Sequence, residues 1–207
     1  MFAECIEKGA VGMAVVNIPA SKSLTLSSKI PLKNIKRNKI FIGGQGRYVY
    51  YSYLFFNIDM IPGNISLLTA KLVLFKTGKL QETRRFAIYP LLQEFCSLTT
   101  YLHSCPFEVC PTLRRTFNVS ASDIVVETDI TELFGRWLNN TLVNRGIAII
   151  EEKFNFQVTG RTSFGSAYCK DKTLIPYIRV VYKEKEGSPY FPIPNIGYCA
   201  TVIPCQS

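Results

Sequence analysis

The chain has 207 residues, of which 47% are hydrophobic and 19% are charged. This composition supports the buried core of one domain and excludes a chain that is disordered throughout. No apolar run approaches the roughly 18 residues of a membrane-spanning helix, so we expect no membrane insertion. The formal net charge is +9, and the basic excess is densest over residues 1–40. This excess suits an anionic partner or a solvated edge. No nucleic-acid motif accompanies it, and we expect no nucleic-acid partner.

Short segments rich in apolar and aromatic residues recur along the chain, and turn signals such as Pro62-Gly63 and Thr77-Gly78 separate them. The predicted strands are 23–30, 38–44, 52–58, 70–76, 84–92, 113–119, 122–128, 145–151 and 176–183. About ten short strands with few helices are typical of an all-β sandwich or barrel. We therefore expect an all-β domain over residues 21–183, a jelly-roll-like antiparallel β-sandwich.

One segment has helical rather than strand periodicity. Its apolar residues follow the spacing i, i+3, i+4, i+7 and i+8, and they are Ile130, Leu133, Phe134, Trp137 and Leu138. Asp129 can cap the start of this helix, with Glu132 three residues further on as in a capping box, and Asn139-Asn140 can end it. We expect one short helix that turns Trp137 into the core rather than towards a ligand.

Both ends of the chain read as extended arms outside the domain. Residues 186–207 contain four prolines, each of which removes a backbone donor and resists pairing within a sheet. We expect an N-terminal arm over residues 1–20 and a C-terminal arm over residues 184–207.

Seven cysteines are many for this length, and the odd number leaves at least one without a partner in the monomer. Frequent cysteine favours an oxidising final location, yet the N-terminus lacks the pattern of a secretory signal peptide. The candidates for intermolecular disulfides are the arm cysteines Cys5, Cys199 and Cys205. The candidates for an intramolecular disulfide are Cys96, Cys105 and Cys110. Ordinary free thiols are the alternative.

The sequence offers little for catalysis. His103 is the only histidine, so any histidine-containing triad has to use it. His103, Cys105 and Cys110 supply three metal ligands, but their spacing matches no familiar zinc signature. Glu151 and Glu152 are adjacent on a predicted strand, so their side chains point to opposite faces and do not form a catalytic pair. We expect no enzyme activity, no metal and no cofactor.

Four sequence blocks cover most of residues 39–182. They are YLFFNIDMIPGNISLLTAKLVLF (53–75), FAIYPLLQEFCSLTTYLHSCP (86–106), ETDITELFGRWLNNTLVNRGIAII (127–150) and FGSAYCKDKTLIPYIRVVY (164–182). In their order and spacing they resemble the DNRLRE domain family, named for a disaggregatase-related repeat. The resemblance implies a β-sandwich of a bacterial or archaeal surface or secreted protein. It also implies a possible ligand, because some members bind acidic polysaccharides.

Tyrosines and arginines provide the raw material for such a ligand. The glycan-binding candidates are Tyr48, Tyr50, Tyr51, Tyr53, Arg84 and Arg85, with Arg114 and Arg115 as a second arginine pair. The tyrosines alternate along one strand, two on each face, and tyrosines on a β-sandwich can present their rings to sugars. Arginines can meet an acidic glycan through charge-assisted hydrogen bonds. The alternative is that the tyrosines fill the core and the arginines face solvent.

The arms lead to a different expectation. A compact domain does not need cysteines on both extensions, whereas arms that reach neighbouring subunits can cross-link them into a filament or pair with a sheet edge. We expect a non-catalytic structural protein, a self-assembling homo-oligomer or filament subunit cross-linked by intermolecular disulfides. Assembly around a spore needs no export signal, so a fibre, spore coat or spore appendage at the spore or cell surface fits. The alternative is a carbohydrate-binding or adhesive module for an acidic polysaccharide.

Overall fold

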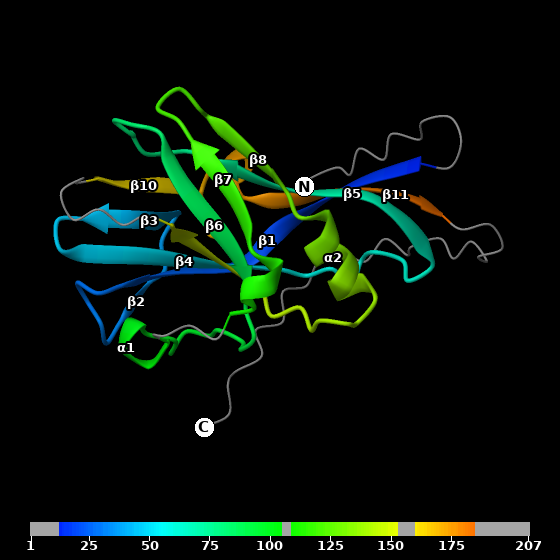
Figure 1. The fold of residues 1–207 in the computed structure, drawn as a ribbon, viewed down its shortest axis with the longest axis horizontal. Helices are drawn as coiled ribbons and strands as arrows, with labels where there is room; N and C mark the ends of the chain where they lie inside the picture. Colours follow the sequence, from blue (N-terminus) through cyan, green and yellow to red (C-terminus); the bar gives the residue numbers. More distant parts are fainter. Residues whose placement is uncertain (1–12, 105–108, 153–159, 185–207) are drawn as a thin grey trace.

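The structure is a computed structural model that describes residues 13–104, 109–152 and 160–184 (Figure 1). The strands are β1 (Met13–Ser27), β2 (Asn34–Ile35), β3 (Lys39–Gln45), β4 (Tyr48–Phe56), β5 (Ile65–Phe75), β6 (Arg84–Pro90), β7 (Arg115–Val119), β8 (Val125–Asp129), β9 (Ile147–Glu151), β10 (Gly160–Gly165) and β11 (Tyr177–Glu184). The helices are α1 (Tyr101–Ser104) and α2 (Thr131–Leu138), and 3-10 turns lie at Pro111–Leu113 and Lys172–Leu174. The predicted all-β class is confirmed.

The strands form two layers that β1 joins. The first half of β1 pairs with β11, which continues to β5 and β8; we call this the β11 layer. The second half of β1 pairs with β4, which continues to β9, β6 and β7, and β3 links β4 to β10; we call this the β9 layer. A register shift between Ala20 and Lys22 marks the crossing. β7 and β8 lie side by side at the other margin, so the antiparallel sandwich is nearly closed (Figure 1).

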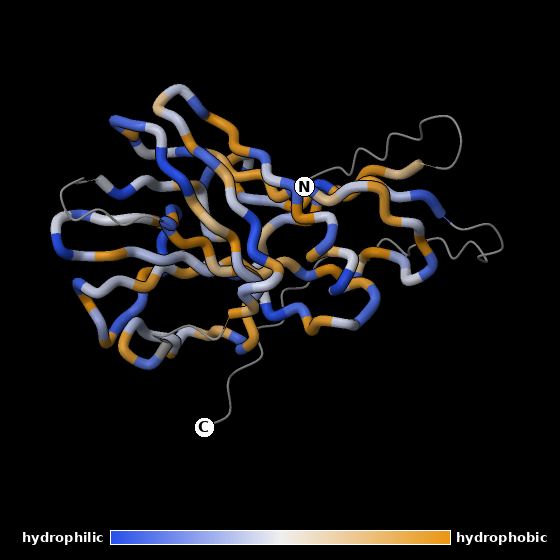
Figure 2. Tube along the Cα trace, in the orientation of Figure 1, coloured by the Kyte–Doolittle hydropathy of each residue, from blue (hydrophilic) through white to orange (hydrophobic). Residues whose placement is uncertain are grey.

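Alternate side chains of both layers meet in one core. Leu72 and Leu74 of β5 face Phe86 of β6 and Phe56 of β4, and none of these side chains is exposed. In Figure 2, hydrophobic and hydrophilic colours follow one another along the strands. The apolar residues of the alternating pattern in the sequence are therefore the ones whose side chains point into the core.

Helix α2 packs against this core as the sequence predicts. Its Trp137 is only 2% exposed, which confirms a packing role. The carboxylate of Asp129 accepts the N–H of Thr131 at the start of the helix. The expected capping box is wrong, because Glu132 pairs instead with Arg115 and Arg136.

The N-terminal boundary differs from the prediction. Strand β1 begins at Met13, and residues 13–19 pair with β11 in a continuous antiparallel register from Met13–Lys183 to Pro19–Tyr177. Residues 13–20 therefore belong to the sandwich and not to an arm. Ile18 and Ala20 are buried in the core, which explains why this segment is ordered into the sheet. Residues 1–12 and 185–207 lie outside the described residues.

A second, smaller apolar cluster covers the outer face of the β9 layer. Residues 91–104 fold back over this face, and Phe95 packs edge-on against Tyr53 with ring centroids 5.5 Å apart. The side-chain amide of Asn34 donates to the carbonyls of Ser97 and Thr99 at 2.7 Å each. These contacts hold the segment in place, so this part of the β9 layer is not open to solvent.

Candidate functional site

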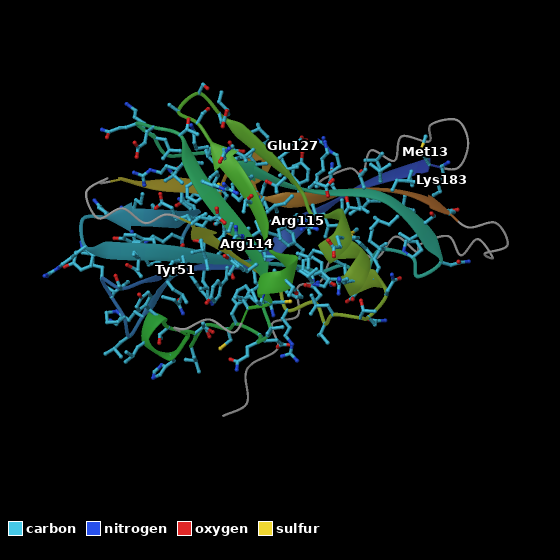
Figure 3. The ribbon with its side chains drawn as sticks, viewed as in Figure 1. Met13, Tyr51, Arg114, Arg115, Glu127 and Lys183 are labelled. Carbon is cyan, nitrogen blue, oxygen red and sulfur yellow. The ribbon has the colours of Figure 1, made fainter. Side chains whose placement is uncertain are left out.

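The first candidate region is the end of the β11 layer where both terminal segments leave the sandwich. Met13 lies directly opposite Lys183 in the antiparallel ladder, and the two residues are adjacent in Figure 3. Residues 1–12 and 185–207 therefore start from neighbouring points of one sheet. The three cysteines predicted to form intermolecular disulfides belong to these segments and lie outside the described residues; they are Cys5, Cys199 and Cys205.

Three cysteines lie within the described residues, and all three are free thiols. Cys96 is exposed, Cys110 is half-buried and Cys169 is buried. Cys96 and Cys110 are thus not bonded to each other, and Cys105, the third intramolecular candidate, lies outside the described residues. A hydrogen bond between Cys110 Sγ and Thr112 Oγ1 at 3.2 Å lowers the pKa of the Cys110 thiol, against the opposing effect of burial.

The four tyrosines of β4 do not form one exposed surface. Tyr50 and Tyr53 are 2% and 3% exposed, because β4 is covered on both faces. Tyr51 is half-buried and stacks on Tyr101 with the rings 3° from parallel. Tyr48 is half-buried beside Arg47, and their hydrogen bond lowers the pKa of the Tyr48 hydroxyl. The alternative from the sequence, tyrosines that fill the core, accounts for Tyr50 and Tyr53.

Arg84 is buried, and its guanidinium group makes ion pairs and a hydrogen bond within the domain. Its Nη1 lies 3.3 Å from Glu151 Oε1, and it donates a hydrogen bond to the Gly160 carbonyl. The side chains of Arg84 and Glu151 are only 6% and 10% exposed. Burial raises the pKa of the Glu151 carboxyl, while Arg84 and the N–H of Gly44 oppose this rise. The pair is a structural element of the core margin.

The neighbouring arginines converge on Glu152. Arg85 Nε lies 2.7 Å from one carboxylate oxygen of Glu152, and Arg114 Nη2 lies 2.6 Å from the other. Glu151 and Glu152 thus pair with different arginines. Arg115, the last of the four predicted arginines, pairs with Glu132 of α2.

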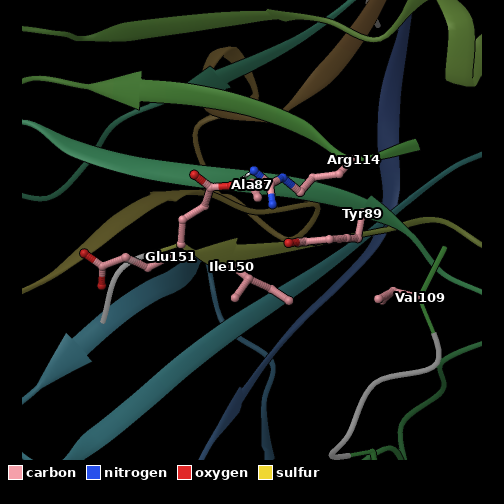
Figure 4. A pocket seen from close by; sticks show the side chains of 7 residues that line it. Ala87, Tyr89, Val109, Arg114, Ile150 and Glu151 are labelled. Carbon is pink, nitrogen blue, oxygen red and sulfur yellow. Dashed lines mark ion pairs between the residues drawn. The ribbon is translucent and has the colours of Figure 1, made fainter. Parts of the chain in front are cut away.

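A cavity of about 530 Å³ opens beside the Glu152 ion pairs. Its lining residues are Ala87, Tyr89, Val109, Arg114, Ile150, Glu151 and Glu152 (Figure 4). Ala87 and Ile150 form a direct cross-strand pair between β6 and β9. The cavity therefore has an apolar floor, one tyrosine and a charged rim.

Sequence reasoning missed Tyr89 and Glu152 as site residues. The available signal was the alternation in β6, which places Arg85, Ala87 and Tyr89 on the face opposite to Arg84 and Phe86. On that face Arg85 is exposed and Tyr89 is half-buried, whereas Ala87 is buried. Sequence alone does not show where the covering segment 91–104 ends.

His103 lies at the surface in α1, where its Nδ1 is 2.9 Å from Thr100 Oγ1. Within residues 13–104, 109–152 and 160–184, no three histidine, cysteine or acidic side chains are grouped to hold a metal ion. None of the helices in the described part of the chain is long and apolar enough to cross a bilayer.

In comparisons with known proteins, no family model and no curated protein matches the chain. The resemblance to the DNRLRE family stays a prediction.

Proposed function

We propose that this protein is a non-catalytic structural subunit that self-assembles and is cross-linked by disulfides through its terminal segments. The observation that carries the proposal is the cross-strand pairing of Met13 with Lys183. It starts both cysteine-bearing segments from neighbouring points at one end of the β11 layer. If the cysteines of these segments meet a different surface of the next subunit, the contact is heterologous and can propagate into a filament.

The body of the domain offers a partner thiol for such a contact. Cys96 is an exposed free thiol in segment 91–104, which covers the β9 layer and not the β11 layer from which the terminal segments start. A terminal cysteine of one subunit and Cys96 of the next would give a head-to-tail link. Forming each disulfide releases two protons and two electrons, and molecular oxygen or a small disulfide serves as the oxidant. An oxidising surface location, such as a spore coat, spore appendage or cell-surface fibre, supplies these conditions.

The test is electrophoresis of the full-length protein from its native source with and without reductant, followed by mass spectrometry of linked peptides. We expect a ladder of multimers that reductant collapses. Cys5→Ser/Cys199→Ser/Cys205→Ser should abolish the ladder, whereas the matched control Cys169→Ser removes a buried thiol and should retain it. Monomers without reductant, or a ladder that survives the triple substitution, would overturn the proposal.

A second candidate is binding of an acidic polysaccharide, and the cavity beside Glu152 favours it. Tyr89 provides a ring for stacking, and Arg114 provides a cation within the same lining. Affinity electrophoresis in a uronic-acid polysaccharide tests this candidate. Retardation should weaken in Tyr89→Ala and Arg114→Ala but persist in the control Tyr168→Ala, which removes an exposed tyrosine outside the cavity lining. Equal mobility of all variants contradicts this second function.

A further inference from the structure

The first half of β1 is the outermost strand of the β11 layer. Residues 13–19 pair with β11 on one side, and no strand in the described part of the chain pairs with them on the other. Within the described residues, no backbone hydrogen bond joins residues 13–19 to a turn or loop either. The described structure therefore leaves one side of this segment as a free sheet edge.

The direction of each backbone group along this edge follows from one hydrogen bond. The Ala20 N–H donates to the Pro176 carbonyl at 2.8 Å, one step beyond Pro19–Tyr177, the last pair of the β1–β11 register. In an antiparallel pair, backbone groups point towards the partner at alternate residues. Ala14, Val16 and Ile18 therefore face β11, whereas the N–H and carbonyl groups of Met13, Val15 and Asn17 face the free edge.

Pro19 marks where this edge stops. By the same alternation its nitrogen faces outward, where the missing N–H breaks no bond to β11. Proline at such a position is a common way to limit pairing at an edge strand. Beyond it, the register shift between Ala20 and Lys22 carries β1 into the β9 layer.

The residues before Pro19 lack the usual protection of an edge. Met13, Ala14, Val15 and Val16 are all apolar, and Figure 2 draws this part of β1 in hydrophobic colours. Met13 is 40% exposed. An apolar edge strand with outward backbone donors and acceptors is a template for another strand, since charges, bulges and short length are what normally prevent such pairing.

We propose that this edge receives residues 196–203 of a second copy as an added strand. The segment reads IGYCATVI, has no charged residue, and lies between Pro194 and Pro204, which limit a strand to this length. It lies outside the described residues. The segment has eight residues, one more than the seven of the edge, 13–19.

The second copy is the occupant that agrees best with the chain path. Residues 185–195 separate the segment from Glu184, and eleven extended residues reach roughly 36–40 Å, enough to bridge two molecules. Within one chain, the shortest path enters the edge at Met13 and runs parallel to β1. A second copy can enter in the antiparallel direction, which is more stable per residue. Antiparallel docking also carries Cys205 past Met13 towards the acceptor's residues 1–12, which hold Cys5. The choice of a second copy thus rests on the proposed function.

The test uses the full-length protein with Cys5, Cys199 and Cys205 replaced by serine, so that only non-covalent association is measured. Sedimentation velocity over a concentration series should show reversible multimers. Val15→Pro removes an outward N–H and keeps the bonds to β11, and Ala200→Pro interrupts the donor segment; each should weaken association about tenfold or more. The matched controls Val15→Thr and Ala200→Ser keep the N–H groups and should associate as the parent does. Near-ultraviolet circular dichroism checks that each variant is folded.

A mixture of the Val15→Pro and Ala200→Pro proteins tests whether the strand added to the edge comes from a second copy. Val15→Pro keeps a donor segment and Ala200→Pro keeps an acceptor edge, so the mixture should form dimers and nothing larger. The proposal would be overturned if the triple-serine protein were monomeric and Val15→Pro reduced the protection of residues 196–203 from hydrogen exchange. That result would mean that the segment pairs with the edge of its own chain. Unchanged association in both proline variants would overturn it as well. Loss of the covalent ladder in the cysteine-containing protein, with reversible association intact, counts only against the disulfide proposal.

Discussion

Arg84 and Glu151 form an ion pair at the inner margin of the sandwich, with Arg84 Nη1 3.3 Å from Glu151 Oε1. The pair sits where β6 begins and β9 ends, beside β3 and β10, and the Gly160 carbonyl accepts a further hydrogen bond from Arg84. The pKa of Glu151 is raised because burial disfavours the charged carboxylate more than Arg84 favours it. A buried pair of this kind contributes little net stability, but removing Arg84 leaves the Glu151 carboxylate without compensation.

Removing the cation should be costly. Arg84→Met leaves the Glu151 carboxylate buried without its partner, and we expect a loss of about 3 kcal/mol in the free energy of unfolding at pH 7. Urea denaturation measures this loss. Adding Glu151→Gln to Arg84→Met removes the stranded charge and should recover most of it. A double variant no more stable than Arg84→Met contradicts the charge explanation.

Glu151→Gln alone should change the free energy of unfolding in the opposite direction to an ordinary salt-bridge deletion, which destabilises a protein. Since the folded-state pKa of Glu151 is raised, the folded protein binds the proton more tightly than the unfolded chain does. The contribution of Glu151 to stability is therefore fully present below the ordinary value near 4.5 and is lost as pH rises through the folded pKa. Glu151→Gln should match the wild type at acid pH and be at least as stable at pH 7. Unfolding free energies of both proteins between pH 4 and pH 8 measure the difference. A variant that falls behind as pH rises would show a lowered pKa instead.

Gly43 should tolerate no side chain. Its φ is +103°, and a Cβ atom there would lie 2.8 Å from Glu151 Oε2. Gly43→Ala therefore combines backbone strain with a clash, and we expect a loss above about 2 kcal/mol. Gly46→Ala shares the positive φ but meets no atom within 4 Å, so it should lose about 1 kcal/mol. Gly63→Ala has neither problem and should stay within about 0.5 kcal/mol. Thermal unfolding of the three variants separates strain from contact, and equal losses would refute that separation.

The sequence predicts those parts of the fold in which local pattern and burial agree. Strands such as β5 and β11 have alternating apolar residues, and α2 has a helical apolar face, so their hydrophobic positions alone identify them. Strand β10 has the sequence GRTSFG, and its strand structure comes from pairing with β3, which no local pattern reveals. The tyrosines of β4 were ambiguous for a similar reason. Whether Tyr53 is a ligand platform or core depends on Phe95, forty-two residues away, which packs on it.

The N-terminal boundary shows the same limit and gives the last prediction. Pro19 interrupts the apolar segment before it, but its nitrogen faces the free edge and leaves the β11 pairing intact. Deleting residues 1–20 removes this pairing along with buried Ile18 and Ala20, and we expect a loss of more than about 4 kcal/mol, which a marginally stable domain does not survive. Deleting residues 1–12 removes none of the described pairings and should leave the thermal midpoint within about 2 °C of the full chain. Far-ultraviolet circular dichroism melts of the two truncations measure the contrast. If the chain lacking residues 1–20 melted cooperatively at the midpoint of the full-length protein, residues 13–20 would not be needed for the folded domain and would count as part of the arm.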